Sequence, residues 1–170
     1  NDIGNLKEAE NSYRKAIKLN PLLTEAHSNL GNILKGQGKS DEAENSYRKA
    51  IKLNPDFAEA HLNLGSLLKD LGNLKEAEQY ARKAIELRPD FAEAHCNLGK
   101  ILIDMDKSEE AELITRKAIE LNPNFAASYT NLGSILKQNR NIKEAEIAIQ
   151  KAIDLNEKDE LAYTILGSIL

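Results

Sequence analysis

The sequence predicts an all-α fold in which antiparallel helix hairpins stack as a solenoid. Prolines recur every 34 residues, at Pro21, Pro55, Pro89 and Pro123. Glycines keep the same spacing, at Gly31, Gly65, Gly99, Gly133 and Gly167. No stretch alternates apolar and polar residues for long enough to indicate a strand. A fixed period of this length is the sequence signature of a stacked repeat fold.

The repeat also sets the expected domain organisation. The chain has 170 residues, which is five periods of 34, and its first and last periods are each cut in the middle. We expect one solenoid domain over residues 1–170. Its parts are a half repeat at 1–23, full repeats at 24–57, 58–91, 92–125 and 126–159, and a half repeat at 160–170.

Each period holds two helical patterns separated by a short break. In the repeat 24–57 the first helix is expected at roughly 23–36 and the second at roughly 40–53. Gly36 and Gly38 mark the break, and Ser40 is a predicted N-cap. Asn73 and Asn141 each precede a glutamate by three residues, which predicts capping boxes there.

The glycines inside the first helices indicate close packing between helices. A glycine in a helix interior costs about 1 kcal/mol relative to alanine, so five such positions need a reason. Lack of a side chain lets a neighbouring helix come close. Alanines on the second helices supply the opposing small surface, at Ala9, Ala43, Ala77, Ala111 and Ala145 and at Ala16, Ala50, Ala84, Ala118 and Ala152.

One unit carries a set of residues that resembles the tetratricopeptide repeat family. Those residues are Leu64, Gly65, Leu68, Ala77, Ala81, Ala84 and Pro89. The resemblance covers nearly the whole chain. It implies a right-handed superhelical solenoid whose first helices line a concave, protein-binding surface. The chain departs from the pattern at Glu157, which stands where a fifth proline is expected.

Composition limits the classes of partner. The net charge is −4, from 23 basic and 27 acidic residues, which argues against a binder of nucleic acid. Cys96 is the one cysteine, so an internal disulfide and a multi-cysteine zinc site are excluded. No apolar run reaches the length of a membrane span, and no signal peptide is recognisable. We therefore expect a cytoplasmic protein without a membrane partner.

His27, His61 and His95 recur at one repeat position, where the family often has an aromatic residue. Their spacing across neighbouring helices, on the order of 10 Å, is too wide to share a zinc ion. At 100° per residue His27 falls among the apolar residues of its helix. We expect these histidines to be core residues, and we expect no catalytic residue, metal or cofactor.

Four asparagines form a ladder on the polar face of the first helices, at Asn29, Asn63, Asn97 and Asn131. An asparagine amide offers a donor and an acceptor together, which matches the backbone of an extended peptide. The ladder is similar to the inner surface of the tetratricopeptide arm of O-linked N-acetylglucosamine transferase, and this similarity implies peptide binding. Positions beside the ladder complete the expected site, at Asn32, Ser66, Lys100 and Ser134. The alternative is that these amides only tie adjacent helices together.

The two ends of the chain suggest self-association. The last helix carries apolar residues with no following helix to cover them, among them Leu161, Ile165, Ile169 and Leu170. Residue 1 has the repeat phase that would follow Leu170, so copies are expected to associate head to tail. Two alternatives remain open. The ends are cut edges of a longer array, or the chain is the substrate-presenting arm of a larger transferase. The sequence favours a non-enzymatic interaction scaffold.

Overall fold

The computed structural model describes residues 2–169, and the side chains from Asn5 to Ile169. This range is all-helical, as predicted. Its helices are α1 (Asp2–Leu19), α2 (Thr24–Gly36), α3 (Ser40–Leu53), α4 (Ala58–Asp70), α5 (Leu74–Leu87), α6 (Ala92–Asp104), α7 (Ser108–Leu121), α8 (Ala126–Gln138), α9 (Ile142–Leu155) and α10 (Glu160–Gly167). None of these helices is long and apolar enough to cross a membrane.

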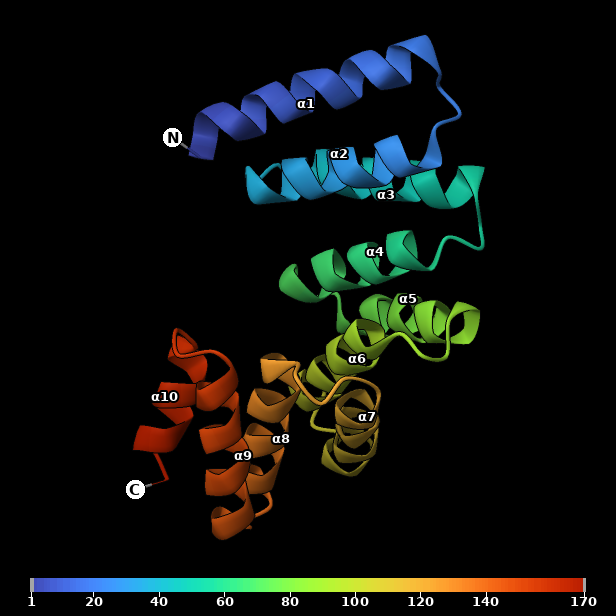
Figure 1. Ribbon diagram of the computed structural model, residues 1–170. Coiled ribbons are helices and arrows are strands. Elements are labelled where there is room, and N and C mark those ends of the chain that lie inside the picture. The colour runs from blue at the N-terminus through green and yellow to red at the C-terminus, as the bar shows by residue number, and fades with distance from the viewer. Residues whose placement is uncertain (1, 170) are drawn as a thin grey trace. The chain divides into compact units, whose positions relative to one another are not determined.

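The chain divides into two compact units, Asn1–Arg88 and Pro89–Leu170. In the first unit α2 and α3 form one hairpin, α4 and α5 form the next, and α1 packs on α2 (Figure 1). In the second unit α6 and α7 form a hairpin, α8 and α9 form another, and α10 packs on α9 and α8 (Figure 1). The helix bounds predicted for the repeat 24–57 are confirmed to within one residue.

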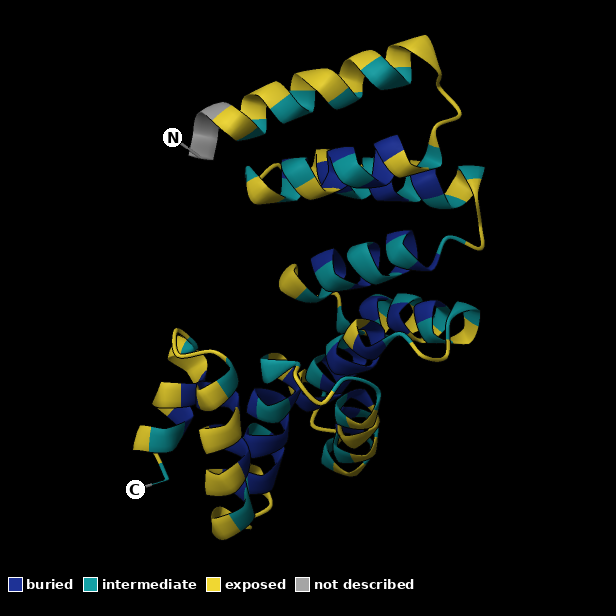
Figure 2. Cartoon of the chain, in the orientation of Figure 1, coloured by how far each residue is buried: buried dark blue, intermediate teal, exposed yellow. Residues whose placement is uncertain are grey.

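In each of the four hairpins the glycine of the first helix lies against the second helix. Figure 2 shows buried residues, in dark blue, along the first helices α6 and α8. A Cβ added at Gly31 would lie 2.5 Å from Cε1 of Tyr47, whose side chain is fully buried. A Cβ added at Gly65 would meet the backbone oxygen of Ala77 at 3.2 Å. The close approach predicted from the glycines is confirmed at Gly31, Gly65, Gly99 and Gly133, but not at Gly167, where an added Cβ would meet nothing within 4 Å. The residue opposite the glycine differs in each repeat, as Tyr47, Ala81, Thr115 and Ile149.

The predicted side-chain caps are wrong. α3 begins at Ser40 itself, and Lys39 holds the N-cap position. Asn73 and Asn141 do occupy N-cap positions, but neither side chain accepts a cap hydrogen bond. Their ψ angles are 58° and 68°, short of the extended conformation from which an N-cap side chain reaches the first turn. Among the described N-cap residues, Asp159 is the one whose side chain accepts, from Ala162 N at 3.0 Å.

The second helices end in the same turn with or without proline. Asn54, which precedes Pro55, has an extended backbone and accepts a hydrogen bond from Asp56 N at its Oδ1, at 3.1 Å. Asn156 precedes Glu157 and behaves in the same way, accepting from Lys158 N at 3.2 Å. The asparagine therefore keeps the turn where the proline is missing.

The buried histidines are confirmed as core residues. His27, His61 and His95 are 8%, 5% and 5% exposed. Nε2 of His27 and of His61 hydrogen-bonds the carbonyl of the proline six residues earlier, at 3.0 and 2.8 Å. Tyr129 stands at the same repeat position and donates its hydroxyl to the Pro123 carbonyl at 3.1 Å. These bonds join α2, α4 and α8 to the turn before each helix, whereas Nδ1 of His95 bonds the carbonyl of Phe91, the N-cap residue of α6, at 3.0 Å.

The turn between the two helices of a hairpin requires a left-handed residue. Gly38 and Gly72 have φ angles of +75° and +80°, and Asp106 and Arg140 take the same position with +58° and +60°. A side chain in this conformation costs roughly 1–2 kcal/mol, and asparagine and aspartate tolerate it better than other residues. Arg140 is therefore the strained member of the series.

Replacing Arg140 with glycine is expected to raise the free energy of unfolding by about 0.5–1 kcal/mol, because relief of strain exceeds the added flexibility of the unfolded chain. Urea denaturation measures the change. Arg140→Ala is the control, since it removes the guanidinium and keeps the Cβ. A glycine variant no more stable than the alanine variant would contradict the assignment of strain.

Candidate functional site

The four asparagines of the ladder all lie on first helices. Asn29 is on α2, Asn63 on α4, Asn97 on α6 and Asn131 on α8. Asn131 is buried, at 8% exposure, and the other three are half-buried. Their common repeat position places one amide on the same part of each first helix.

In the first unit the two ladder asparagines differ. Asn63 Nδ2 donates to the hydroxyl of Ser28 on α2 at 3.3 Å. Ser28 is 2% exposed, so this bond lies between the two first helices. The side chain of Asn29 has no hydrogen-bond partner within residues 2–169. Asn63 is thus hydrogen-bonded to the preceding first helix, α2, and the side chain of Asn29 is not hydrogen-bonded within the described residues.

The second unit repeats this difference. Asn131 Nδ2 donates to the backbone oxygen of Cys96 on α6 at 3.0 Å and lies 3.4 Å from its Sγ. Asn97 has no side-chain hydrogen bond within the described part of the chain. Each unit therefore holds one tied and one free asparagine.

The neighbouring positions of the first unit are already hydrogen-bonded. Asn32 is exposed, and its Oδ1 accepts from the hydroxyl of Tyr47 at 2.8 Å, which leaves its NH₂ group available. Ser66 accepts from Lys35 Nζ at 2.9 Å, and Lys35 also pairs with Asp70 at 2.7 Å. Hydrogen bonds from Lys35 and Lys69 hold the pKa of the Asp70 carboxyl below its usual value, although partial burial opposes this effect.

The corresponding positions of the second unit are Lys100 and Ser134, both half-buried. Lys100 pairs with Asp104 one turn later on the same helix, at 2.6 Å, so its charge is neutralised locally. The hydroxyl of Thr130, just before Asn131, donates to Asp159 Oδ2 at 2.7 Å. Polar side chains thus surround the asparagines in both units without gathering charge of one sign.

Arginines on the second helices join consecutive repeats, a feature that sequence reasoning missed. Each of these arginines pairs with the glutamate four residues earlier on its own helix, at Arg14, Arg48, Arg82 and Arg116. Arg14 also reaches Glu42, Arg48 reaches Glu76 and Arg116 reaches Glu144, each glutamate lying 28 residues later, at 2.6, 2.7 and 2.7 Å. The sequence signal was the glutamate in the first turn of each following second helix. Such exposed pairs contribute about 0.2–1 kcal/mol each.

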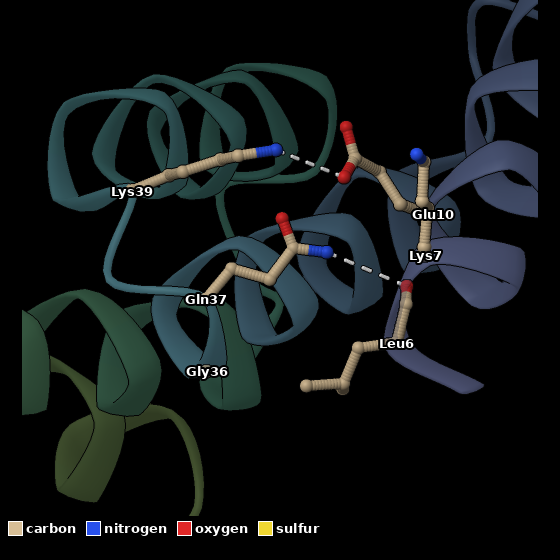
Figure 3. A pocket seen from close by; sticks show the side chains of 6 residues that line it. All are labelled: Leu6, Lys7, Glu10, Gly36, Gln37 and Lys39. Atoms are coloured by element: carbon tan, nitrogen blue, oxygen red, sulfur yellow. Dashed lines mark hydrogen bonds and ion pairs between the residues drawn. The ribbon is translucent and has the colours of Figure 1, made fainter. Parts of the chain in front are cut away.

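The first unit also has a cavity of about 430 Å³ away from the ladder, between α1 and the end of α2. It is lined by Leu6, Lys7, Glu10, Gly36, Gln37 and Lys39 (Figure 3). Figure 3 shows Lys39 reaching Glu10 Oε2, at 3.0 Å. Hydrogen bonds from Arg14 first, and then from Lys39, lower the pKa of Glu10 from 4.5 to about 2. Glu10 and Lys39 therefore neutralise each other at this cavity.

Glu10 makes the stability of the fold depend on pH in the acidic range. Its pKa is lowered in the folded chain, so the ionised carboxylate stabilises the fold above about pH 4.5, and this contribution is lost as the pH falls towards about 2. Glu10→Gln is expected to flatten the decline of the urea midpoint between pH 4.5 and pH 2. Glu8→Gln, on the exposed side of the same helix, is the control. Parallel pH profiles for wild type and Glu10→Gln would contradict the effect.

The residues expected at the C-terminal end lie in different environments. Leu161 is 51% exposed on α10, whereas Ile165 is 7% exposed and packs within the chain against Ile149 and Ile153. Ile169 is half-buried against the same core, and Leu170 lies outside the described residues. The open face of α10 is formed instead by Leu161, by Tyr163 at 50% exposure and by Gly167, where an added Cβ would meet nothing within 4 Å.

Within residues 2–169 no three His, Cys, Asp or Glu side chains are grouped so that they could hold a metal ion. Cys96, the cysteine of the chain, is buried beside Asn131. The polar groups of the first helices can donate and accept hydrogen bonds, which suits recognition of a ligand by contact.

Family profiles described as tetratricopeptide repeat match residues 28–92, 70–124 and 115–147, and one described as TPR repeat matches residues 1–38. No curated protein matches the sequence.

Several solved structures are similar to the chain. The crystal structure of MamA shares 27% identity over 92% of each chain, with a TM-score of 0.77. YrrB, described as a TPR protein with an unusual peptide-binding site, shares 26% identity over 96% of this chain and 84% of its own, with a TM-score of 0.72. A thermophilic TPR protein of Thermus thermophilus shares 18% identity over 99% of this chain and 92% of its own. Its TM-score of 0.80 shows that the fold is the same.

Proposed function

We propose that this chain, which belongs to the tetratricopeptide repeat family, is a non-enzymatic scaffold that binds an extended protein or peptide segment along its first helices. The observation that carries the proposal is the pair of half-buried asparagines, Asn29 and Asn97, whose amides make no hydrogen bond within the described residues. The unusual peptide-binding site named for the similar protein YrrB supports it.

The chemistry of an amide explains what such a site recognises. Nδ2 of asparagine donates to a peptide carbonyl, and Oδ1 accepts from a peptide N–H. These groups recur in every peptide unit of an extended strand, so the asparagines hydrogen-bond the backbone of the ligand. Binding through them depends little on the side chains of the ligand. Selectivity then comes from varied neighbours such as Leu62 and Lys100, which differ between repeats.

The test begins with a peptide selected from a random display library against the wild-type chain. Asn29→Ala combined with Asn97→Ala is expected to weaken binding of that peptide by about five- to 150-fold, since two lost hydrogen bonds are worth about 1–3 kcal/mol. Asn11→Ala with Asn45→Ala, which removes two exposed asparagines from second helices, is the control. Unchanged affinity in the folded Asn29/Asn97 variant refutes binding through these amides.

A second candidate function, head-to-tail association, rests on the faces of α1 and α10. Gly31 accommodates the ring of Tyr47 inside the chain. Tyr13 occupies on α1 the repeat position that Tyr47 has on α3, and Gly167 corresponds to Gly31. In the 170-residue chain Tyr13 is half-buried and Gly167 faces open space. We propose that Tyr13 of one copy packs against Gly167 of another and rebuilds the hairpin contact between molecules.

Light scattering over a concentration series tests this association. The mass of the wild-type chain is expected to rise with concentration, and Gly167→Leu, which fills the space facing Tyr13, is expected to keep the chain monomeric. Thr164→Leu, which enlarges the side chain at an exposed position of α10, is the control. A wild-type chain that is monomeric at every concentration rules the association out.

A further inference from the structure

We infer that the asparagine ladder is divided between two roles, with Asn29 and Asn97 contacting the ligand and Asn63 and Asn131 holding adjacent first helices together. This inference rests on the proposed function, because it assigns the rungs of that same site. The two interpretations that the sequence left open are then both correct, each for half of the rungs.

The tied rungs share one geometry. Asn63 bonds residue 28, and Asn131 bonds residue 96, so each reaches back 35 residues to the preceding first helix. Both bonds use Nδ2 as the donor. The contact joins α4 to α2 in the first unit and α8 to α6 in the second, where these pairs of first helices pack together. Because the same bond joins consecutive first helices in both units, we assign it a structural role in holding those helices together.

Burial sets Asn131 apart from the other three asparagines. Asn131 is 8% exposed, so a ligand could reach its amide only after the bond to the Cys96 carbonyl opened. Using that amide would exchange one hydrogen bond for another and yield little affinity. Asn29 and Asn97 are half-buried and have no bond to give up within residues 2–169. A hydrogen bond from either of them to a ligand is therefore a net gain.

In each unit the hydrogen bond ends on the residue just before the first asparagine of that unit. Ser28 offers its hydroxyl to Asn63, and Cys96 offers its backbone oxygen and Sγ to Asn131. Thr130 holds the same position before Asn131, but its hydroxyl bonds Asp159, because Ile165 stands where a fifth rung would be. The acceptor is a side-chain hydroxyl at Ser28 and a backbone oxygen at Cys96, so the two bonds share their position in the repeat but differ in the accepting group.

The experiment uses acetyl-Ala-Gly-Ala-Gly-Ala-amide, a probe that presents a peptide backbone and almost no side chain. It is titrated into the ¹⁵N-labelled chain while the side-chain NH₂ resonances of the four asparagines are followed. Resonances of Asn29 and Asn97 are expected to shift and saturate, with those of Asn63 and Asn131 unmoved. Equal shifts at all four overturn the division and leave the proposed function standing. No shift at any of the four overturns both.

Ser28→Ala provides a matched variant, because it removes the partner of Asn63 and leaves Asn63 in place. The resonance of Asn63 is expected to begin responding to the same probe in Ser28→Ala. Ser28→Thr keeps a hydroxyl and is expected to leave Asn63 silent. If the Asn63 resonance does not shift in a folded Ser28→Ala chain, the bond to Ser28 is not what prevents Asn63 from binding the ligand, and the inference is wrong.

Discussion

Replacing Gly31 with alanine is expected to lower the free energy of unfolding by about 2 kcal/mol, although alanine is the better helix former. The new Cβ would lie 2.5 Å from Cε1 and 2.9 Å from Cζ of Tyr47. That ring is fully buried, and its hydroxyl is held by Asn32 at 2.8 Å, so it cannot swing aside into solvent. The cost of moving it is expected at the upper end of the usual range for overpacking, about 3 kcal/mol, and exceeds the gain of about 1 kcal/mol in helix propensity.

The control for this change lies five residues later on the same helix. A Cβ added at Gly36 would meet nothing within 4 Å, so Gly36→Ala is expected to leave stability unchanged or raise it by up to about 1 kcal/mol. Urea denaturation of both variants gives the comparison. If Gly31→Ala proves as stable as Gly36→Ala, the close approach of α3 to α2 is not what requires the glycine.

Removing the hydroxyl of Ser128 is expected to raise the free energy of unfolding by about 1–2 kcal/mol. Its Oγ is buried without a hydrogen-bond partner, and the side chain is fully buried on α8. The same repeat position holds alanine in the other full repeats, at Ala26, Ala60 and Ala94. Ser128→Ala therefore removes an unsatisfied polar atom and places a side chain that the fold already accepts.

Thr115→Ala extends the same argument to the slot opposite Gly99. Thr115 Oγ1 is also buried without a partner, and Ala81 fills the equivalent slot opposite Gly65. Its gain is expected to be smaller than that of Ser128→Ala, because the methyl group lost with it had filled space. Ser134→Ala, at a half-buried serine of α8, corrects both values for helix propensity. Gains no larger than that of Ser134→Ala would contradict the assigned penalty.

The sequence determines most of the fold because its signals are local and periodic. The spacing of prolines and glycines predicted the helices of the repeat 24–57 to within one residue, and the glycines correctly indicated close packing. The capping-box spacing at Asn73 and Asn141 was misleading, because with ψ angles of 58° and 68° neither side chain accepts from an N–H of the first turn. Asn141 instead donates to the Glu144 carboxylate at 2.7 Å.

The candidate site was predicted less completely, because its side chains depend on a neighbouring helix. All four ladder asparagines share one repeat position, and nothing in their own helices separates Asn63 from Asn29. Asn63 is bonded by Ser28, 35 residues earlier on the preceding first helix, whereas within residues 2–169 no first helix precedes α2 to offer Asn29 such a partner. Likewise, Ile165 was placed on an open face by its pattern, while the structure packs it inward against Ile149.

A structure of the chain bound to a peptide selected from the display library tests the central claim most directly. The proposed function and the division of the ladder together place peptide backbone atoms within about 3 Å of the amide atoms of Asn29 and Asn97. They also leave the bonds from Asn63 to Ser28 and from Asn131 to Cys96 intact. A peptide bound on the second helices, or one that reaches Asn63 and Asn131 while leaving Asn29 and Asn97 unbonded, would contradict the claim.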